Sequence, residues 1–321
     1  MAGNTIFKIG RARDVRAVDY RGVLCMLVLL FYALVALPAQ SAGKLFIDIN
    51  YAGDTNVYHR MDIHLPESGL TRYPVVIAVY GCAFFGNNLK EEAFRTLGYP
   101  LVKAGFAVVT VNHRSSRDDL FPAQIHDIKA AVRFVRAQGT AYHLDTSFIG
   151  ITGYSSGGHL SVMTGTTGNN PSYRIGSKKV DLEGKIGNFL HFSSSVDAVV
   201  DWFGPTDFLV MDSCGSEMHH DTISSPESSL VGGPIQEEIV ACAFANPISY
   251  VDPGDPPFLI FHGDADPLVP WCESELLYQA LMDDRVPVEF IRVPGGKHGP
   301  GVFNEENYQR MVEFFRLNNR N

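Results

Sequence analysis

The stretch Phe148-Ile-Gly-Ile-Thr-Gly-Tyr-Ser-Ser-Gly-Gly-His-Leu160 decides the fold of this chain. Its first residues favour a β-strand, and residues 156–163 are compatible with a helix. A serine flanked by glycines at such a strand-to-helix turn is typical of a nucleophile elbow. The turn is sharp, so the neighbours of Ser155 must lack bulk, a requirement that Gly153 and Gly157 meet. The pattern predicts that the Ser155 hydroxyl is exposed at the end of a strand.

An acid and a histidine follow this serine in the chain. Asp266 lies in the polar loop after the apolar run 258–263, and His298 lies in the glycine-rich loop after the run 288–293. Nucleophile, acid and histidine occur in this order in α/β hydrolases. All three residues follow apolar runs, and open parallel sheets place their sites at the carboxyl ends of strands. Asp264 is the rival acid, but it directly follows a His-Gly pair and is interpreted as a turn residue.

Residues 1–42 differ from the rest of the 321-residue chain. Five basic residues precede the charge-free run Val23–Leu37, and small residues follow it. This layout is typical of a secretory signal peptide, and the run is short for a membrane-spanning helix, which needs about 20 residues. We therefore expect residues 1–42 to be a signal peptide and residues 43–321 to be one catalytic domain, exported to the periplasm or secreted. An uncleaved membrane anchor is the alternative.

The charge balance narrows the classes of partner. The formal net charge is −9, and residues 1–42 contribute a net +3, which leaves −12 on the remainder. An acidic exported chain without a basic patch is a poor match for nucleic acid or anionic membranes. The expected partner is a small-molecule or oligosaccharide ester, and no stable membrane partner is expected after signal cleavage.

Four cysteines remain after residue 42, without C-x-x-C or zinc spacing. A disulfide is plausible in an oxidising compartment. We favour Cys214, in a polar loop, and Cys272, just after the acid loop; four free thiols are the alternative. Cys242 lies among apolar residues and is expected to be buried. The pair His219-His220 is expected to be solvated, so no metal site is predicted.

The alternation of apolar runs and helical patterns indicates the fold class. The run 74–79 is continuously apolar, as in strands covered on both faces, and 106–111 is expected to be another buried strand. This alternation predicts a mostly parallel sheet with helices on both faces. An irregular insert at about 205–246 is expected to form a short cap. The other expected elements are antiparallel strands at 45–49 and 60–65, a strand at 198–203, and helices at 89–103, from 122 onward, at 271–281 and at 304–317.

Six motifs carry a resemblance to a known family. They are Tyr80-Gly-Cys-Ala-Phe-Phe-Gly-Asn-Asn88, Phe121-Pro-Ala-Gln-Ile-His-Asp-Ile-Lys-Ala-Ala131, Gly153-Tyr-Ser-Ser-Gly-Gly-His159, Val200-Asp-Trp-Phe-Gly-Pro-Thr-Asp-Phe208, His262-Gly-Asp-Ala-Asp-Pro-Leu-Val-Pro270 and Gly295-Gly-Lys-His-Gly299. Over residues 44–318 the chain resembles the carboxylesterase branch of the α/β hydrolases that includes bacterial feruloyl and acetyl-xylan esterases. The resemblance implies the α/β-hydrolase fold and hydrolysis of carboxylic esters without a cofactor, often of acetyl or feruloyl groups on plant polysaccharide. It also implies that Ser155, Asp266 and His298 form the catalytic triad.

The expected chemistry assigns a role to each of these residues. His298 would take the proton of Ser155, and Asp266 would fix the tautomer of His298, so activity should fall as His298 becomes protonated. The oxyanion needs backbone donors. We expect the Ser156 N–H and, from the loop after the strand at 74–79, Cys82 or Ala83. Relatives often have His-Gly-Gly in this loop, so here the donors would act from ordinary φ/ψ.

Several further residues are candidates for substrate contact. Phe84, Phe85, Asn87 and Asn88 follow the oxyanion loop, and Trp202 ends a strand, although core packing is the alternative for this tryptophan. His159 is interpreted as structural, and residues 113–117 as a salt-bridged loop. Two other functions stay open: a serine peptidase of the oligopeptidase type, and a non-catalytic binding protein on the same fold.

Overall fold

The structure is a computed structural model that describes residues 43–67 and 69–319. The expected signal peptide lies outside the described residues. All described residues belong to one unit, Ala39–Asn321. Among them, no helix combines the length and the apolar character needed to cross a bilayer.

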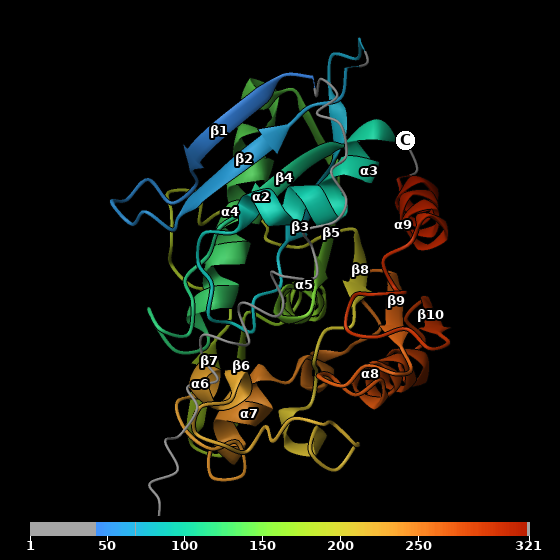
Figure 1. The fold of residues 1–321 in the computed structure, drawn as a ribbon. Coiled ribbons are helices and arrows are strands. Elements are labelled where there is room, and N and C mark those ends of the chain that lie inside the picture. The colour runs from blue at the N-terminus through green and yellow to red at the C-terminus, as the bar shows by residue number, and fades with distance from the viewer. Residues whose placement is uncertain (1–42, 68, 320–321) are drawn as a thin grey trace, which may run out of the picture. The chain divides into compact units, whose positions relative to one another are not determined.

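The unit is built around an eight-stranded sheet with the order β1-β2-β4-β3-β5-β8-β9-β10 (Figure 1). Strands β1 and β2 pair in antiparallel fashion, as expected, and β2 is antiparallel to β4. Every pair from β4 to β10 is parallel. The strands are β1 (Leu45–Asn50), β2 (Arg60–His64), β3 (Tyr73–Val79), β4 (Ala107–Val111), β5 (Leu144–Tyr154), β8 (Ala198–Trp202), β9 (Phe258–Gly263) and β10 (Val288–Val293).

Helices cover both faces of this sheet because the side chains of its strands alternate between two apolar clusters. Along β3, Val75 and Ile77 pack with α4, α5 and α8, whereas Val76 and Ala78 pack with α2, α3 and α9. The helices are α2 (Lys90–Ala93), α3 (Tyr99–Lys103), α4 (Ala123–Gln138), α5 (Ser156–Thr166), α8 (Cys272–Asp283) and α9 (Glu305–Asn318). A π-turn (Phe94–Gly98) joins α2 to α3 within the helix expected at 89–103. This arrangement is the α/β-hydrolase fold, as the resemblance implies.

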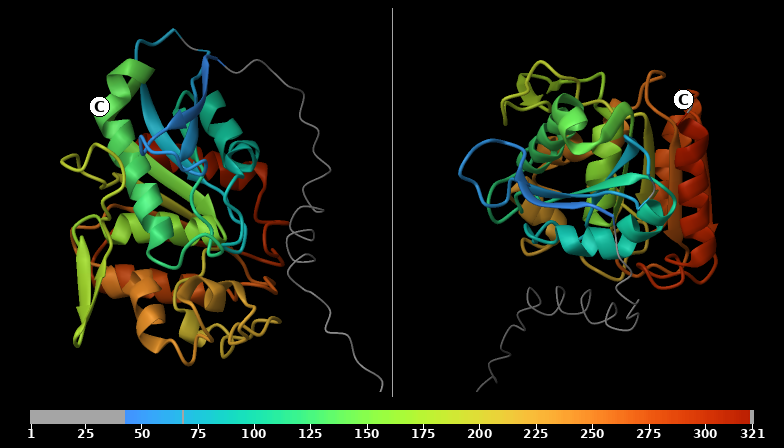
Figure 2. Two further views of the ribbon diagram at one scale, coloured as in Figure 1. Left: turned by 90° about the vertical axis from the view of Figure 1, so that its left-hand side faces the viewer. Right: turned by 90° about the horizontal axis from the view of Figure 1, so that it is seen from above.

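Two segments are more ordered than the sequence suggests. A hairpin of β6 (Ser172–Ile175) and β7 (Lys178–Asp181) forms a separate two-stranded sheet (Figure 2). The cap, expected to be irregular, contains α6 (Pro226–Val231) and α7 (Ile239–Ala245), and its apolar residues form a cluster with Phe84 and Val269 of neighbouring loops. The serine-rich sequence of the cap contains ordinary signals for the ends of a helix. The Ser225 side chain caps α6 by accepting from the Ser228 N–H, and Gly232 ends α6 at a φ of 95°.

Candidate active site

Ser155 occupies the turn between β5 and α5, with a φ of 55° and a ψ of −126°. A Cβ atom at Gly153 would lie 2.2 Å from the Gly157 carbonyl oxygen, and one at Gly157 would lie 2.3 Å from that of Tyr80. Glycine is therefore required on both sides of the serine. The positive φ costs about 1–3 kcal/mol. A hydrogen bond of 2.9 Å from the Ser155 N–H to the Trp202 carbonyl helps to hold the turn.

The carboxyl ends of three parallel strands bring Ser155, His298 and Asp266 together. His298 Nε2 lies 2.9 Å from Ser155 Oγ, and His298 Nδ1 lies 2.7 Å from Asp266 Oδ2. A carboxylate accepts only, so Nδ1 carries the proton of the neutral ring and Nε2 can accept from the serine hydroxyl. This is the tautomer that removal of the serine proton requires.

Asp266 is buried but amply hydrogen-bonded. Its Oδ1 accepts from the N–H groups of Leu268 and Val269, at 2.9 and 3.1 Å. Burial alone would raise the pKa of Asp266. The charge of His298, together with hydrogen bonds from His262 and His298, outweighs burial and holds that pKa well below its ordinary value. The carboxylate therefore stays ionised beside His298.

Asp264, the rival acid, serves the turn instead. Its Oδ1 accepts from the Gly295 N–H at 2.7 Å, and its Oδ2 lies 3.4 Å from Arg292 Nε. These contacts join the loops after β9 and β10, which present Asp266 and His298. The sequence interpretation of Asp264 as a turn residue agrees with this geometry.

Two neighbours of the site were not among the predicted site residues. His262 is buried at the end of β9, with Nε2 3.4 Å from Asp266 Oδ2. Phe203 has a φ of 45°, and its ring centroid lies 4.7 Å from that of His298. A histidine inside an apolar strand, four residues before the acid, is a signal that could have identified His262. Phe203 carries no such signal, because an aromatic residue after an apolar strand is ordinarily core.

The oxyanion loop after β3 differs from expectation. The Cys82 N–H donates to Ser156 Oγ at 2.9 Å, so the expectation that it faces the oxyanion is wrong. Ala83 and Phe84 have φ values of 53° and 59°, not the ordinary values expected. Within the part of the chain that the structure describes, the Ala83 N–H has no acceptor. The Ser156 N–H begins α5 and lacks an i−4 partner in the helix. Ser156 and Ala83 are therefore the two candidate donors.

Neighbouring loops hold this unusual backbone. The Phe84 carbonyl accepts from the Ser116 N–H at 2.8 Å, and Asn87 Nδ2 donates to Asp118 at 2.8 Å. The loop at 113–117 is salt-bridged, as expected, since Arg114 pairs with the buried Asp127 at 2.8 Å. Such contacts offset the cost of two positive φ angles at residues other than glycine.

The predicted substrate contacts are only partly accessible. Phe84 and Trp202 are buried in apolar clusters, so the prediction that they line a substrate pocket is wrong. The physical reason is core packing: the Trp202 ring stacks on that of Phe261, with 4.2 Å between centroids. Phe85 stays half-buried and Asn88 exposed. Asn88 Oδ1 accepts from Asn112 Nδ2 at 2.7 Å, and the Asn87 amide donates to Asp118.

His159 and His220 have structural environments. His159 is buried, with Nδ1 3.0 Å from the Pro205 carbonyl oxygen, and burial lowers its pKa to about 4. This agrees with its interpretation as structural. His219 is exposed, but His220 is buried, contrary to the expectation that both are solvated. The Glu227 carboxylate, 2.7 Å from His220 Nδ1, compensates for this burial.

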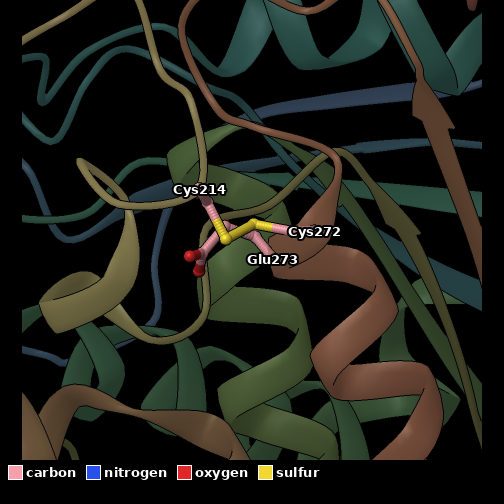
Figure 3. A group of neighbouring side chains, drawn as sticks. All are labelled: Cys214, Cys272 and Glu273. Carbon is pink, nitrogen blue, oxygen red and sulfur yellow. A yellow bond between two sulfur atoms is a disulfide. The ribbon is translucent and has the colours of Figure 1, made fainter.

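Cys214 and Cys272 form the expected disulfide, with their Cα atoms 6.3 Å apart. It joins the cap to the first turn of α8, and the Glu273 carboxylate lies beside it (Figure 3). Among the described residues these three make the one group with metal-like spacing, but its two sulfur atoms are bonded to each other. Cys242 is buried, as expected.

Replacing Cys214 and Cys272 together by alanine should destabilise the protein by about 4 kcal/mol, because a cross-link 58 residues apart restricts the unfolded chain. The measurement is urea unfolding of the oxidised wild type and of the double variant. Dithiothreitol should lower the midpoint of the wild type and leave that of the variant unchanged. Equal midpoints for the oxidised wild type and the variant would contradict the prediction.

Comparisons with known proteins place this geometry in a family. The family model BD-FAE matches residues 61–281. A structure titled truncated form of carbohydrate esterase from gut microbiota is 44% identical, with a TM-score of 0.84, over 88% of this chain and 98% of that chain. A bifunctional GH43-CE protein of Bacteroides eggerthii is 48% identical, with a TM-score of 0.82, over 88% of this chain and 39% of that one.

A curated relative extends the comparison. The probable carboxylic ester hydrolase LipM of Mycobacterium tuberculosis is 28% identical over 78% of this chain and 55% of its own length. The chain spans about half the length of the curated relatives that it matches first. The family match covers more than two thirds of the chain, and its span includes both Ser155 and Asp266. The chain therefore belongs to the BD-FAE family.

Proposed function

We propose that this chain is a serine hydrolase of carboxylic esters. The observation that carries the proposal is the continuous hydrogen-bond chain from Ser155 Oγ through the His298 ring to Asp266. His298 Nε2 takes the serine proton as Oγ attacks the ester carbonyl carbon. The N–H groups of Ser156 and Ala83 stabilise the oxyanion of the tetrahedral intermediate.

The reaction proceeds through an acyl-enzyme. Collapse of the tetrahedral intermediate breaks the bond to the leaving alcohol, which receives its proton from His298. Water then attacks the acylated Ser155, again with His298 as base, and releases the carboxylic acid. Asp266 stabilises the imidazolium in both halves of the reaction, and no cofactor takes part.

The substrates are acetyl or feruloyl esters of carbohydrate, in particular of plant polysaccharide. The ester-hydrolase and carbohydrate-esterase relatives support ester hydrolysis, and the motifs shared with feruloyl and acetyl-xylan esterases support this substrate class. Phe85 is half-buried beside the oxyanion loop, and the Arg117 guanidinium lies 4.9 Å from its ring centroid, so an aromatic ring and a hydrogen-bond donor for sugar hydroxyls lie together there. Export is part of the proposal: the composition of residues 1–42 and the Cys214–Cys272 disulfide both suit an oxidising compartment.

A substrate panel tests the proposal. We expect the highest kcat/KM on acetylated xylo-oligosaccharides or feruloylated arabino-oligosaccharides, and lower values on 4-nitrophenyl acetate and on longer acyl chains. Amino-acyl arylamides serve as the control. Faster cleavage of these amides than of any ester would replace the proposal with a peptidase, and saturable binding of the oligosaccharides without turnover would replace it with a binding protein.

A further inference from the structure

His262 is a second histidine beside the Asp266 carboxylate, in addition to His298. It is the penultimate residue of β9, and its side chain is fully buried. Its Nε2 lies 2.9 Å from the Val269 carbonyl oxygen and 3.4 Å from Asp266 Oδ2. Oδ2 is also the oxygen that lies 2.7 Å from His298 Nδ1. One carboxylate oxygen therefore faces two imidazole rings.

The partners of His262 fix where its proton lies. The Val269 carbonyl only accepts, so Nε2 must carry a proton. Nδ1 lies 2.7 Å from Ser274 Oγ, whose hydroxyl can donate to an unprotonated nitrogen. Such a donor at Nδ1 makes the ring the neutral Nε2–H tautomer. Its N–H then donates to the Val269 carbonyl, and Nε2 also lies within 3.4 Å of the carboxylate of Asp266.

Ser274 is itself fixed by its neighbours in the first turn of α8. Cys272 is bonded to Cys214 of the cap, with Glu273 beside this bond (Figure 3). Glu273 Oε2 accepts from the N–H groups of Thr206 and Asp207 at 2.8 and 2.7 Å. The hydroxyl that orients His262 is thus supplied by a turn that is tied to the cap at two points. A group that sets the position of another side chain needs such support.

We propose that His262 is a positioning residue of the esterase reaction: as a neutral donor to Oδ2, it fixes the Asp266 carboxylate in the orientation that His298 requires. The inference rests on the proposed serine mechanism. The N–H groups of Leu268 and Val269 hold Oδ1, and His262 supplies the matching restraint on Oδ2. With both oxygens held, the carboxylate cannot rotate away from His298 during turnover.

The charges around this carboxylate give the expected direction of a pH effect. The titratable groups that face it are His262 of β9 and His298 of the loop after β10. Phe203, the residue directly after β8, packs against both rings and carries no charge, and the Glu273 carboxylate of α8 accepts from the N–H groups of Thr206 and Asp207. Loss of the His262 N–H concentrates negative charge on Oδ2 and stabilises the imidazolium of His298. In a variant without this N–H, the acid limb of the pH–activity profile should therefore move to higher pH.

Two substitutions at His262 separate positioning from packing. His262→Phe fills the space without a donor and should lower kcat roughly 10- to 100-fold, the usual effect of losing a hydrogen bond to a charged group. KM should change little, and the acid limb of kcat/KM should move to higher pH. His262→Gln places an amide N–H near the position of Nε2 and should restore most of both properties. The assay is 4-nitrophenyl acetate hydrolysis over a pH series, with folding checked by circular dichroism.

Three results would overturn the inference. The first is a folded His262→Phe variant that has the kcat of the wild type and an unchanged acid limb in its pH–activity profile. Another is a fall in kcat that His262→Gln does not reverse and that leaves the acid limb in place, as a structural role alone predicts. The third result does not depend on the folding of the variants. It is a ¹⁵N NMR spectrum of histidine-labelled wild-type protein in which His262 is protonated at Nδ1 and not at Nε2. Ser155→Ala separates the two proposals, since activity retained there removes the serine mechanism itself.

Discussion

Ser155→Ala should lower kcat by about five to six orders of magnitude on every ester that the protein hydrolyses. Alanine removes the only atom that lies within hydrogen-bond distance of His298 Nε2 in the described residues, so no acyl-enzyme can form. The methyl group fits the elbow, and stability should change little. Initial rates with 4-nitrophenyl acetate and with an acetylated xylo-oligosaccharide measure the loss, and thermal unfolding checks the fold.

Ser156→Ala is the matched control at the adjacent position. The Ser156 hydroxyl is buried and accepts from the Cys82 N–H, 2.9 Å away, so alanine removes this hydrogen bond at a cost of about 1–3 kcal/mol. We expect a moderate loss of stability and activity, far smaller than at Ser155. A covalent phosphonate should add its mass to Ser156→Ala and not to Ser155→Ala. Wild-type rates in Ser155→Ala would show that another group is the nucleophile.

The core of the fold could be predicted because its strands have unambiguous patterns. The runs that became β3 and β4 are almost entirely apolar, as is typical of strands covered on both faces. The turn at Ser155 could be predicted equally well, because it requires glycine at fixed positions. A Cβ atom at Gly153 or Gly157 would lie 2.2 or 2.3 Å from a backbone oxygen, so neither position admits a side chain. The meeting of Ser155, Asp266 and His298 follows from chain order, because parallel strands end at one edge of the sheet.

The oxyanion loop could not be predicted because tertiary contacts override local preference there. The sequence Tyr80-Gly-Cys-Ala-Phe84 does not predict the positive φ angles at Ala83 and Phe84, because residues other than glycine rarely adopt such angles. The burial of the Phe84 ring against Phe208 and the hydrogen bond from Ser116 stabilise this conformation. Both partners are distant in sequence, so no local rule includes them.

The prediction of substrate-contacting residues failed for a related reason. An aromatic residue at a strand end can line a pocket or pack in the core, and the pattern of residues 198–203 does not show which. For Trp202 the structure selects the core, where its ring stacks on Phe261 and its Nε1 donates to Thr152 Oγ1 at 3.2 Å. Burying this indole with its N–H paired avoids the cost of an unsatisfied donor.

Asp266→Asn should lower kcat about 10³- to 10⁴-fold while the protein stays folded. An amide can present its NH₂ group to His298 Nδ1, which then becomes the acceptor, and the ring carries its proton on Nε2. The nitrogen that must accept from Ser155 is thereby blocked. The lost negative charge also leaves the imidazolium unsupported. Rates measured at alkaline pH should recover only in part, since hydroxide can replace the base but not the oriented ring.

Asp264→Asn is the matched control, two residues away in the same loop. Asp264 Oδ1 accepts from the Gly295 N–H at 2.7 Å, and an asparagine oxygen can accept the same bond. Its weak contact with the exposed Arg292, at 3.4 Å, contributes little because exposed ion pairs are worth about 0–1 kcal/mol. We expect kcat within about threefold of wild type. A reversed result, with Asp264→Asn inactive and Asp266→Asn active, would assign the acid to Asp264. It would also mean that the 2.7 Å contact between Asp266 and His298 has no part in catalysis.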